Sequence, residues 1–384
     1  MLQKVAIDNV EIGMYVEQIE SQHARTKMKK PGFIRRQETI ENLRNKGVIF
    51  VYVDADQITS DEDLRYQATK VGKHSSIKGN DEYGAAKELV DTSKKQLSKL
   101  LTAIYENKPV DIEPVKEVSA DIVENIFERK DAVLWISGIR EKSAYLLEHS
   151  MNVAFHLVNF GRFLEFDRET LEELAIGGLV HDIGKILVRD EVLNKPGKLT
   201  DEEFLHMKEH QTLSQPVLDS MLDLPQNSKN VSLMHHEKID GNGYPKGLKG
   251  DELPLIGRMS CIVDIYDALT AERCYKPALS PSEAFKIMIG LTPFHLDPDL
   301  LKKFIRCIGF YPIGSVVELS NGRVGLVCKE NPDDLMTPTV KLFYSARTEA
   351  FREVEYVDLR KRPDLKIIRG ITEAKLKKSF SDFR

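Results

Sequence analysis

The chain has 384 residues and a formal net charge of −5 at pH 7, and 41% of its residues are hydrophobic and 30% are charged. This length exceeds that of one typical domain, and the composition is that of globular rather than disordered proteins. The mild negative charge excludes a general attraction to nucleic acid or to an anionic membrane surface. Any anionic ligand must therefore be held by a local cluster of cations.

The cysteines and the hydropathy pattern indicate a cytoplasmic protein. The four cysteines are scattered without a C-x-x-C spacing, which argues against a disulfide framework or a thiolate zinc site and suits a reducing compartment. The first residues lack the apolar core of a signal peptide, and no run approaches the roughly 18 apolar residues that cross a bilayer. We therefore expect no membrane insertion. The cysteines are Cys261, Cys274, Cys307 and Cys328.

Residues 1–54 are predicted to form a small α+β module, for which a regulatory role is a hypothesis. Runs rich in β-branched and aromatic residues predict strands over 5–7, 13–16 and 48–53. A short helix is expected over 38–44, ended by Gly47. The basic stretch 27–36 is interpreted as a solvated loop, and the polar residues 55–82 as a linker.

Residues 83–310 are predicted to form a compact domain of seven or more helices. Apolar residues recur at spacings of three and four residues over 88–105, 115–127, 144–164 and 171–180. Capping-box patterns at Thr200-x-x-Glu203 and Ser280-Pro281-Ser282-Glu283 predict two helix starts.

Residues 311–384 are predicted to form a small β-rich appendage. The dipeptide Asn321-Gly322 is a strong hairpin signal between strands expected over 314–319 and 324–327, and 339–344 could add a third strand. The fold class expected for the whole chain is therefore mainly α, with a compact helical domain between a small α+β module and a small β appendage.

Residues that can bind metals are concentrated on separate predicted helices of the middle region. Each one alone has an ordinary explanation, such as a core histidine or a salt bridge. A buried carboxylate in an apolar helix is costly unless a cation or hydrogen bonds compensate it, and several helices carrying such residues inward predict a common metal centre. A further ligand could come from either His206 or His210. The other candidates are His149, His181, Asp182, His235, His236 and Asp264.

Imidazole and carboxylate ligands without thiolate suit iron, manganese, nickel or zinc. Two such metals about 3.5–4 Å apart can share a carboxylate and a water whose lowered pKa provides hydroxide near neutral pH. Asp182 is the natural bridging carboxylate. Lys185, three residues later, could hold a phosphate oxygen or protonate the leaving group, although it could also be an ordinary solvated lysine. Asp182 and Lys185 are therefore the candidate catalytic residues.

These motifs closely resemble the HD-GYP branch of the HD-domain metal-dependent phosphohydrolases, which hydrolyse cyclic di-GMP. The resemblance covers about residues 144–301 and depends on many motifs in order rather than on one dipeptide. The motifs are His149-Ser150-x-x-Val153-Ala154, His181-Asp182-Ile183-Gly184-Lys185, Asn194-Lys195-Pro196-Gly197-x-Leu199-Thr200, His210, His235-His236-Glu237, Asp240-Gly241-x-Gly243-Tyr244-Pro245, Arg258, Asp264-x-Tyr266-Asp267-Ala268-Leu269-Thr270 and Arg273-x-Tyr275-Lys276.

The resemblance implies an HD-type helical domain and a definite set of site residues. It favours His210 over His206, and it implies two divalent ions, with iron or manganese expected first and nickel or zinc as alternatives. Some members bind a third metal through a glutamate that is Tyr145 here. Glu237 and Asp267 would orient a ligand or the lysine. The implied metal ligands are His149, His181, Asp182, His210, His235, His236 and Asp264, and the implied substrate contacts are Lys185, Tyr244, Asp267, Arg273 and Lys276.

The expected reaction is hydrolysis of cyclic di-GMP to linear pGpG, with GMP as a conceivable further product. One alternative substrate is cyclic GMP-AMP or another phosphodiester, and another alternative is a non-catalytic adaptor that binds a cyclic dinucleotide. Gln211 and Ser214 depart from the proline and glycine usual in the family, and 238–239 from an Arg-aromatic pair. Residues 1–54 resemble a small uncharacterised module found in front of such domains. The expected partners are the cyclic dinucleotide and conceivably a second copy or a regulatory protein, but no nucleic acid.

Overall fold

The computed structural model describes residues 2–7, 10, 15–21, 25–34, 37–45, 48–54, 79–137, 145–195, 197–271, 277–331, 333–376 and 380. The chain divides into two compact units, Met1–Asn80 and Asp81–Arg384. Among the described residues, no helix is long and apolar enough to cross a membrane.

The described residues of the first unit form an antiparallel sheet and a helix over Gln37–Asn45, in agreement with the predicted α+β module. Its strands are ordered β1-β4-β2-β3. Ile40 of the helix and Val16 and Val51 of the sheet are buried in one apolar cluster, which explains why these β-branched residues recur in the sequence. The elements are β1 (Leu2–Ala6), β2 (Tyr15–Ser21), β3 (Arg25–Phe33), α1 (Gln37–Asn45) and β4 (Val48–Asp54).

Strand β3 corrects the expectation of a solvated loop over 27–36. It pairs antiparallel with β2, from Tyr15 opposite Phe33 to Glu20 opposite Arg25. Its lysine-rich sequence lacks the usual strand composition, but β3 is an edge strand of the described sheet, and lysines are common on edges because they discourage pairing with other chains. Of the predicted linker, residues 55–78 lie outside the described residues, and helix α3 already begins at Gly79.

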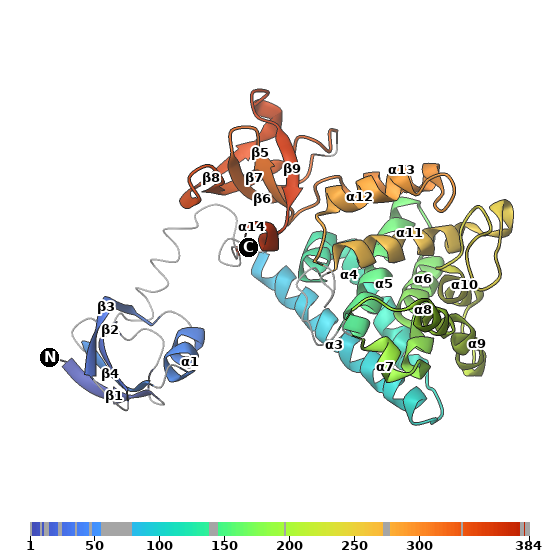
Figure 1. The fold of residues 1–384 in the computed structure, drawn as a ribbon, viewed down its shortest axis with the longest axis horizontal. Coiled ribbons are helices and arrows are strands. Elements are labelled where there is room, and N and C mark those ends of the chain that lie inside the picture. The colour runs from blue at the N-terminus through green and yellow to red at the C-terminus, as the bar shows by residue number, and fades with distance from the viewer. Residues whose placement is uncertain are drawn as a thin grey trace. The chain divides into compact units, whose positions relative to one another are not determined.

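The second unit begins with the helical domain (Figure 1). Helix α5 lies at its centre, in contact with α4, α6, α11 and α13. Its helices are α3 (Gly79–Tyr105), α4 (Glu113–Ser137), α5 (Tyr145–Phe163), α6 (Arg168–Val180), α7 (Asp190–Leu193), α8 (Asp201–Lys208), α9 (His210–Ser220), α10 (Gln226–Met234), α11 (Leu255–Thr270), α12 (Pro281–Gly290) and α13 (Pro298–Ile308), with the short 3-10 helices η3 (Ile183–Leu187) and η4 (Gly250–Glu252).

Close approach of α5 and α6 brings the first ligand residues together. A Cβ on Gly178 of α6 would lie 2.5 Å from Cα of Ala154 on α5, so only glycine permits this spacing. Both predicted capping boxes are confirmed. Thr200 and Glu203 bond each other's backbone N–H groups at the start of α8, and the N–H and hydroxyl of Ser280 donate to Glu283 Oε2 at the start of α12.

A five-stranded antiparallel sheet follows the helices, with strand order β8-β7-β6-β5-β9. The predicted hairpin at Asn321-Gly322 joins β5 to β6, and the third predicted strand is β7. Strand β9 contacts α12, because Gly370 leaves room for Ser282 there. The elements are β5 (Val316–Leu319), β6 (Arg323–Lys329), β7 (Thr339–Ser345), β8 (Ala350–Asp358), η5 (Leu359–Lys361), β9 (Ile367–Ile371) and α14 (Glu373–Leu376).

Candidate metal centre

The structure brings all seven predicted metal ligands into one cluster, from the middle of two helices and the ends of three others. His149 comes from α5 and Asp264 from α11. The remaining ligands are placed by helix ends: His181 follows α6 and is followed by Asp182 at the start of η3, His210 begins α9, and His235 and His236 follow α10. Six of the seven are buried, and the side chain of His236 is 23% exposed.

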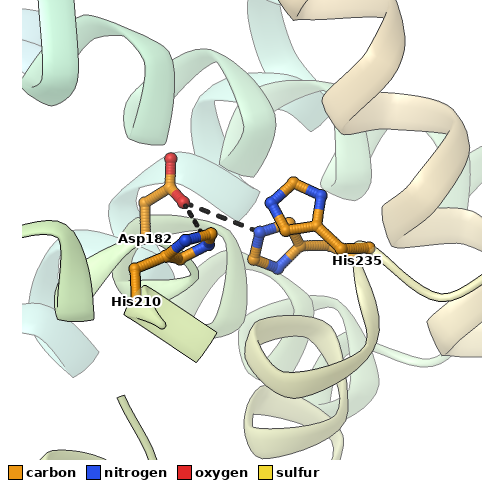
Figure 2. Close-up of side chains that lie close together, drawn as sticks. Asp182, His210 and His235 are labelled. Atoms are coloured by element: carbon orange, nitrogen blue, oxygen red, sulfur yellow. Dashed lines mark ion pairs between the residues drawn. The ribbon is translucent and has the colours of Figure 1, made fainter. Parts of the chain in front are cut away.

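Asp182 lies between two pairs of imidazoles. Its Oδ1 is 3.6 Å from Nε2 of both His210 and His235 (Figure 2). Its Oδ2 is 3.4 Å from Nε2 of His149 and 3.3 Å from Nε2 of His181. Oδ1 is buried and has no hydrogen-bond partner. Because an unpaired buried carboxylate oxygen is costly, this arrangement fits a cation on each side of Asp182.

The candidate ligands form two groups, and within each group the ligand atoms lie within 4.8 Å of one another. Asp264 also connects the groups, since its Oδ1 is 3.1 Å from His149 Nε2 and its Oδ2 is 3.9 Å from His236 Nδ1. The groups are Asp182, His210, His235 and His236, and His149, His181 and Asp264.

Backbone carbonyls orient three of the rings. Nδ1 of His181 lies 2.8 Å from Gly178 O, Nδ1 of His210 lies 2.6 Å from Met207 O, and Nδ1 of His235 lies 2.8 Å from Ser232 O. Each Nδ1–H therefore donates to a carbonyl, which leaves the lone pair of Nε2 directed into the cluster. This is the tautomer that a metal ligand requires.

The protonation state of His149 differs from that of the other imidazoles with shifted pKa values. Burial lowers the pKa of His210 to about 4, so this ring is neutral at pH 7. Burial alone would also lower the pKa of His149, but its hydrogen bonds with Asp264 and Asp267 outweigh burial and raise this pKa to about 9. Without a metal, His149 therefore carries a proton that a metal would replace.

Lys185 connects the buried carboxylate to the outside of the cluster. Its ammonium forms an ion pair with Oδ2 of Asp182, and its side chain is 20% exposed. Burial alone would raise the pKa of Asp182, but Lys185 and His181 hold it well below its usual value. The carboxylate is therefore ionised and able to bind cations at every physiological pH.

Tyr244 lies beside His236, the partly exposed ligand, and Lys208 lies beside Tyr244. The ring of Tyr244 stacks on that of His236 with centroids 4.8 Å apart and an interplanar angle of 30°. Nζ of Lys208 lies 5.1 Å from the Tyr244 ring centroid. The sequence analysis missed Lys208, although its place two residues before His210 on a helix end was a usable signal. Arg273 and Lys276 lie outside the described residues.

Two expected orienting residues have different roles. Oδ2 of Asp267 lies 2.7 Å from Nδ1 of His149, and the side chain is fully buried, so it orients the ring of a predicted ligand, while a contact of Asp267 with substrate stays a prediction. Glu237 was expected to orient a ligand or the lysine, but it accepts hydrogen bonds from the backbone N–H groups of Lys246, Gly247 and Leu248. It thus fixes the loop that follows Tyr244, because hydrogen bonds from backbone N–H groups to a carboxylate are stronger than those to a neutral acceptor.

Gly184 and Ser214 hold the start of α9 against Asp182. A Cβ on Gly184 would lie 2.1 Å from the carbonyl oxygen of His210. The Gly184 N–H donates to Ser214 Oγ at 3.0 Å, and Ser214 donates to His210 O at 2.8 Å. The alternative ligand His206 lies outside both groups, with Nδ1 2.6 Å from Glu209 Oε2.

Comparison with known proteins identifies the chain. Residues 137–300 match the HD domain, residues 2–115 match a domain of unknown function (DUF3391), and residues 316–379 match the KOW domain associated with HD domain. The cyclic di-GMP phosphodiesterase PA4108 of Pseudomonas aeruginosa is 31% identical over 373 residues, which are 94% of this chain and 89% of that protein. The chain belongs to the HD-GYP family of phosphodiesterases.

Other similar proteins match over smaller parts of the chain. A 3'3'-cGAMP-specific phosphodiesterase 1 of Vibrio cholerae is 36% identical over 157 residues, 41% of this chain and 36% of that protein. Among solved structures, Bd1817, an HDG"Y"P protein from Bdellovibrio bacteriovorus, has a TM-score of 0.50 at 16% identity and covers 79% of this chain and 98% of its own. This likeness shows that the fold is shared.

Proposed function

We propose that this HD-GYP phosphodiesterase hydrolyses cyclic di-GMP to linear pGpG in the cytoplasm, with residues 83–310 as its catalytic domain. The observation that carries the proposal is the position of Asp182, whose two oxygens face different pairs of imidazoles. The match of nearly the whole chain to a protein named as a cyclic di-GMP phosphodiesterase supports this choice of substrate.

The donor set of imidazole and carboxylate without thiolate fits two divalent ions, which can be iron, manganese, nickel or zinc. Iron or manganese is proposed first because the resemblance to the HD-GYP family implies these metals. Asp182 would bridge the ions. His149, His181 and Asp264 would hold one, and His210, His235 and His236 the other. When bound, such a pair supplies an activated water and polarises the phosphoryl group of the substrate.

The protein residues have separate tasks in this proposal. Lys185 reaches from Asp182 to the exposed side of the cluster, where its ammonium can hold a non-bridging phosphate oxygen. Lys208 can attract the second phosphate. Tyr244, held against His236, offers a ring edge and hydroxyl to a guanine. Arg273 and Lys276 stay predicted substrate contacts.

A second candidate substrate is 3',3'-cyclic GMP-AMP. A relative of Vibrio cholerae that is named for this substrate is 36% identical over 157 residues, which supports this alternative, because loop contacts rather than the metal ligands select the base. A non-catalytic adaptor is disfavoured, because the proposed ligand set is complete and its buried carboxylates are ionised.

The proposal is tested with the purified full chain loaded with Mn²⁺ or Fe²⁺ and incubated with cyclic di-GMP, 3',3'-cyclic GMP-AMP and cyclic di-AMP. Chromatography of the products and elemental analysis are the measurements. We expect pGpG, with cyclic di-GMP consumed fastest. A metal-loaded chain that leaves all three dinucleotides intact would contradict the proposal, and faster turnover of cyclic GMP-AMP would favour the second candidate.

A further inference from the structure

Gln211 places a carboxamide inside the candidate metal centre. It follows His210 on α9, and its side chain is fully buried. Its Nε2 lies 3.0 Å from Nε2 of His210 and 3.1 Å from Nε2 of His235. These are the two ring nitrogens that face Oδ1 of Asp182. The carboxamide therefore lies among three donor atoms of one half of the site.

The hydrogen bonds of this carboxamide are unbalanced. Its N–H groups point at the lone pairs of two imidazoles, while its Oε1 is buried without a hydrogen-bond partner. Leaving a buried acceptor unpaired costs about 1–3 kcal/mol. Asp182 Oδ1, which faces the same two rings, is also buried without a hydrogen-bond partner. Two unpaired oxygens beside two imidazole lone pairs form a donor set that a cation would satisfy.

A cation held by His210 and His235 would face the positive end of the Gln211 amide in its present orientation. Rotation by about 180° about the terminal bond exchanges the nitrogen and oxygen with almost no change in shape, and the two atoms are distinguished by their hydrogen bonds. The rotated amide directs Oε1 at the cation.

We propose that Oε1 of Gln211 is an additional ligand of the metal held by Asp182, His210, His235 and His236. This inference rests on the metal centre of the proposed function and adds a residue to it. An amide oxygen suits Mn²⁺ and Fe²⁺, which accept more oxygen donors than the four ligands usual for Zn²⁺. Gln211 therefore biases this half of the site toward manganese or iron. The proline usual in the family at this position offers no such donor.

The test is a titration of the metal-free full chain with Mn²⁺. The electron paramagnetic resonance signal reports the concentration of free Mn²⁺ at each step, and a competing chelator makes low dissociation constants measurable. Wild type binds two equivalents. In Gln211→Leu, which has a similar volume and no donor, one equivalent weakens by about 10–100-fold, the range typical when a supporting group of a metal site is lost. The other equivalent stays unchanged, and the affinity for Zn²⁺ falls less than that for Mn²⁺.

Gln215→Leu is the matched control. Gln215 lies one turn later on α9 and bonds Asp219 at the surface, so its loss should leave both affinities unchanged. Gln211→Glu keeps an oxygen at the same reach and adds charge, and it should bind the weakened equivalent at least as tightly as wild type. If Gln211→Leu fails to fold, the Mn²⁺ affinity of Gln211→Glu alone tests whether this side chain binds the metal.

Two results would overturn the inference: Gln211→Leu with both wild-type Mn²⁺ affinities, or Gln211→Glu with a lower affinity than wild type. Failure of the proposed function is visible separately in the wild-type chain, as fewer than two bound equivalents or as an absence of cyclic dinucleotide turnover.

Discussion

Asp267 lies directly behind His149, with its Oδ2 2.7 Å from Nδ1 of that ring. On the other side of the same ring, Nε2 lies 3.1 Å from Oδ1 of Asp264. One imidazole thus joins a carboxylate deep in the helical core to a carboxylate at the proposed metals. Such a partner fixes the orientation of the ring and increases its basicity as a ligand.

Replacing Asp267 should therefore weaken metal binding rather than substrate binding. Asp267→Asn keeps the shape of the side chain but removes its charge, and we expect metal affinity to fall by about 10–100-fold. Competition with a chelator measures this loss. A raised KM with unchanged metal affinity would instead show that Asp267 contacts the substrate, as the sequence analysis had allowed.

The pKa of His149 makes metal uptake depend on pH. The ring is protonated in the metal-free protein below a pKa of about 9, and a metal requires the neutral ring. Metal binding at pH 7 should therefore release about one proton from this site, and affinity should rise with pH up to about 9. Calorimetry in buffers of different ionisation enthalpy counts the released protons. Affinity that stays constant between pH 6 and about 9 would contradict the assignment of His149 as a ligand.

The same proton has the opposite effect on the metal-free fold. Because the folded pKa of about 9 exceeds the unfolded value of 6.5, the protonated ring stabilises the folded chain fully below the unfolded pKa. This contribution is lost as pH rises from the unfolded pKa through about 9. The thermal midpoint of the metal-free chain should thus fall over the pH interval in which metal affinity rises.

Asp182→Ala should abolish hydrolysis while the helical domain stays folded. The substitution removes the carboxylate that faces both imidazole pairs, and with it the proposed bridge between the metals. We expect turnover to fall by more than about 10³-fold, since the metals supply several kcal/mol of transition-state stabilisation. Turnover and circular dichroism are measured on the same preparation. Substantial turnover free of contaminating enzyme would contradict the mechanism.

The sequence predicts which residues form the site better than it predicts how they meet. Helical spacing places His149 on a buried face, and the chemistry of adjacent His-Asp and His-His pairs suggests metal ligands. Which oxygen of Asp182 faces which pair depends on how the ends of α6, α9 and α10 converge, and this is a tertiary property. The proposed role of Gln211 as a ligand could not be predicted for the same reason, because the sequence does not show where the side chain of a polar residue next to a ligand points.

The strands show a similar limit. The dipeptide Asn321-Gly322 predicts its hairpin because the turn is local. The sequence analysis missed β8 and β9, the edge strands of the described sheet. Most of β8 is exposed, and its charged residues Arg352, Glu353, Glu355 and Asp358 fall on both faces, so no apolar face marks it in the sequence. Strand β9 is short and pairs with β5 across about fifty residues of chain, so only the fold defines it.

Lys185→Ala should lower kcat and leave the metal content unchanged. The ammonium of Lys185 pairs with Asp182 Oδ2, but it cannot be a metal ligand because it has no lone pair. Loss of a cation aimed at a reacting phosphate costs about 10²–10³ in kcat. Elemental analysis of the purified variant is the control, and loss of metal would mean that Lys185 serves mainly to position Asp182.

Gly184→Ala should disrupt the site by pushing the start of α9, which carries His210, away from η3. The added Cβ would meet the His210 carbonyl oxygen at 2.1 Å, so η3 and α9 must separate. We expect the free energy of unfolding to fall by about 1–3 kcal/mol, the usual cost of overpacking, and metal affinity to fall because His210 moves away from Asp182. Gly290→Ala is the matched control, since nothing lies within 4 Å of the added Cβ in α12 and alanine favours the helix. Denaturant unfolding followed by circular dichroism, with metal titration of both variants, measures the two effects. Equal stabilities and affinities for the two variants would show that the tight contact of Gly184 with α9 does not position His210.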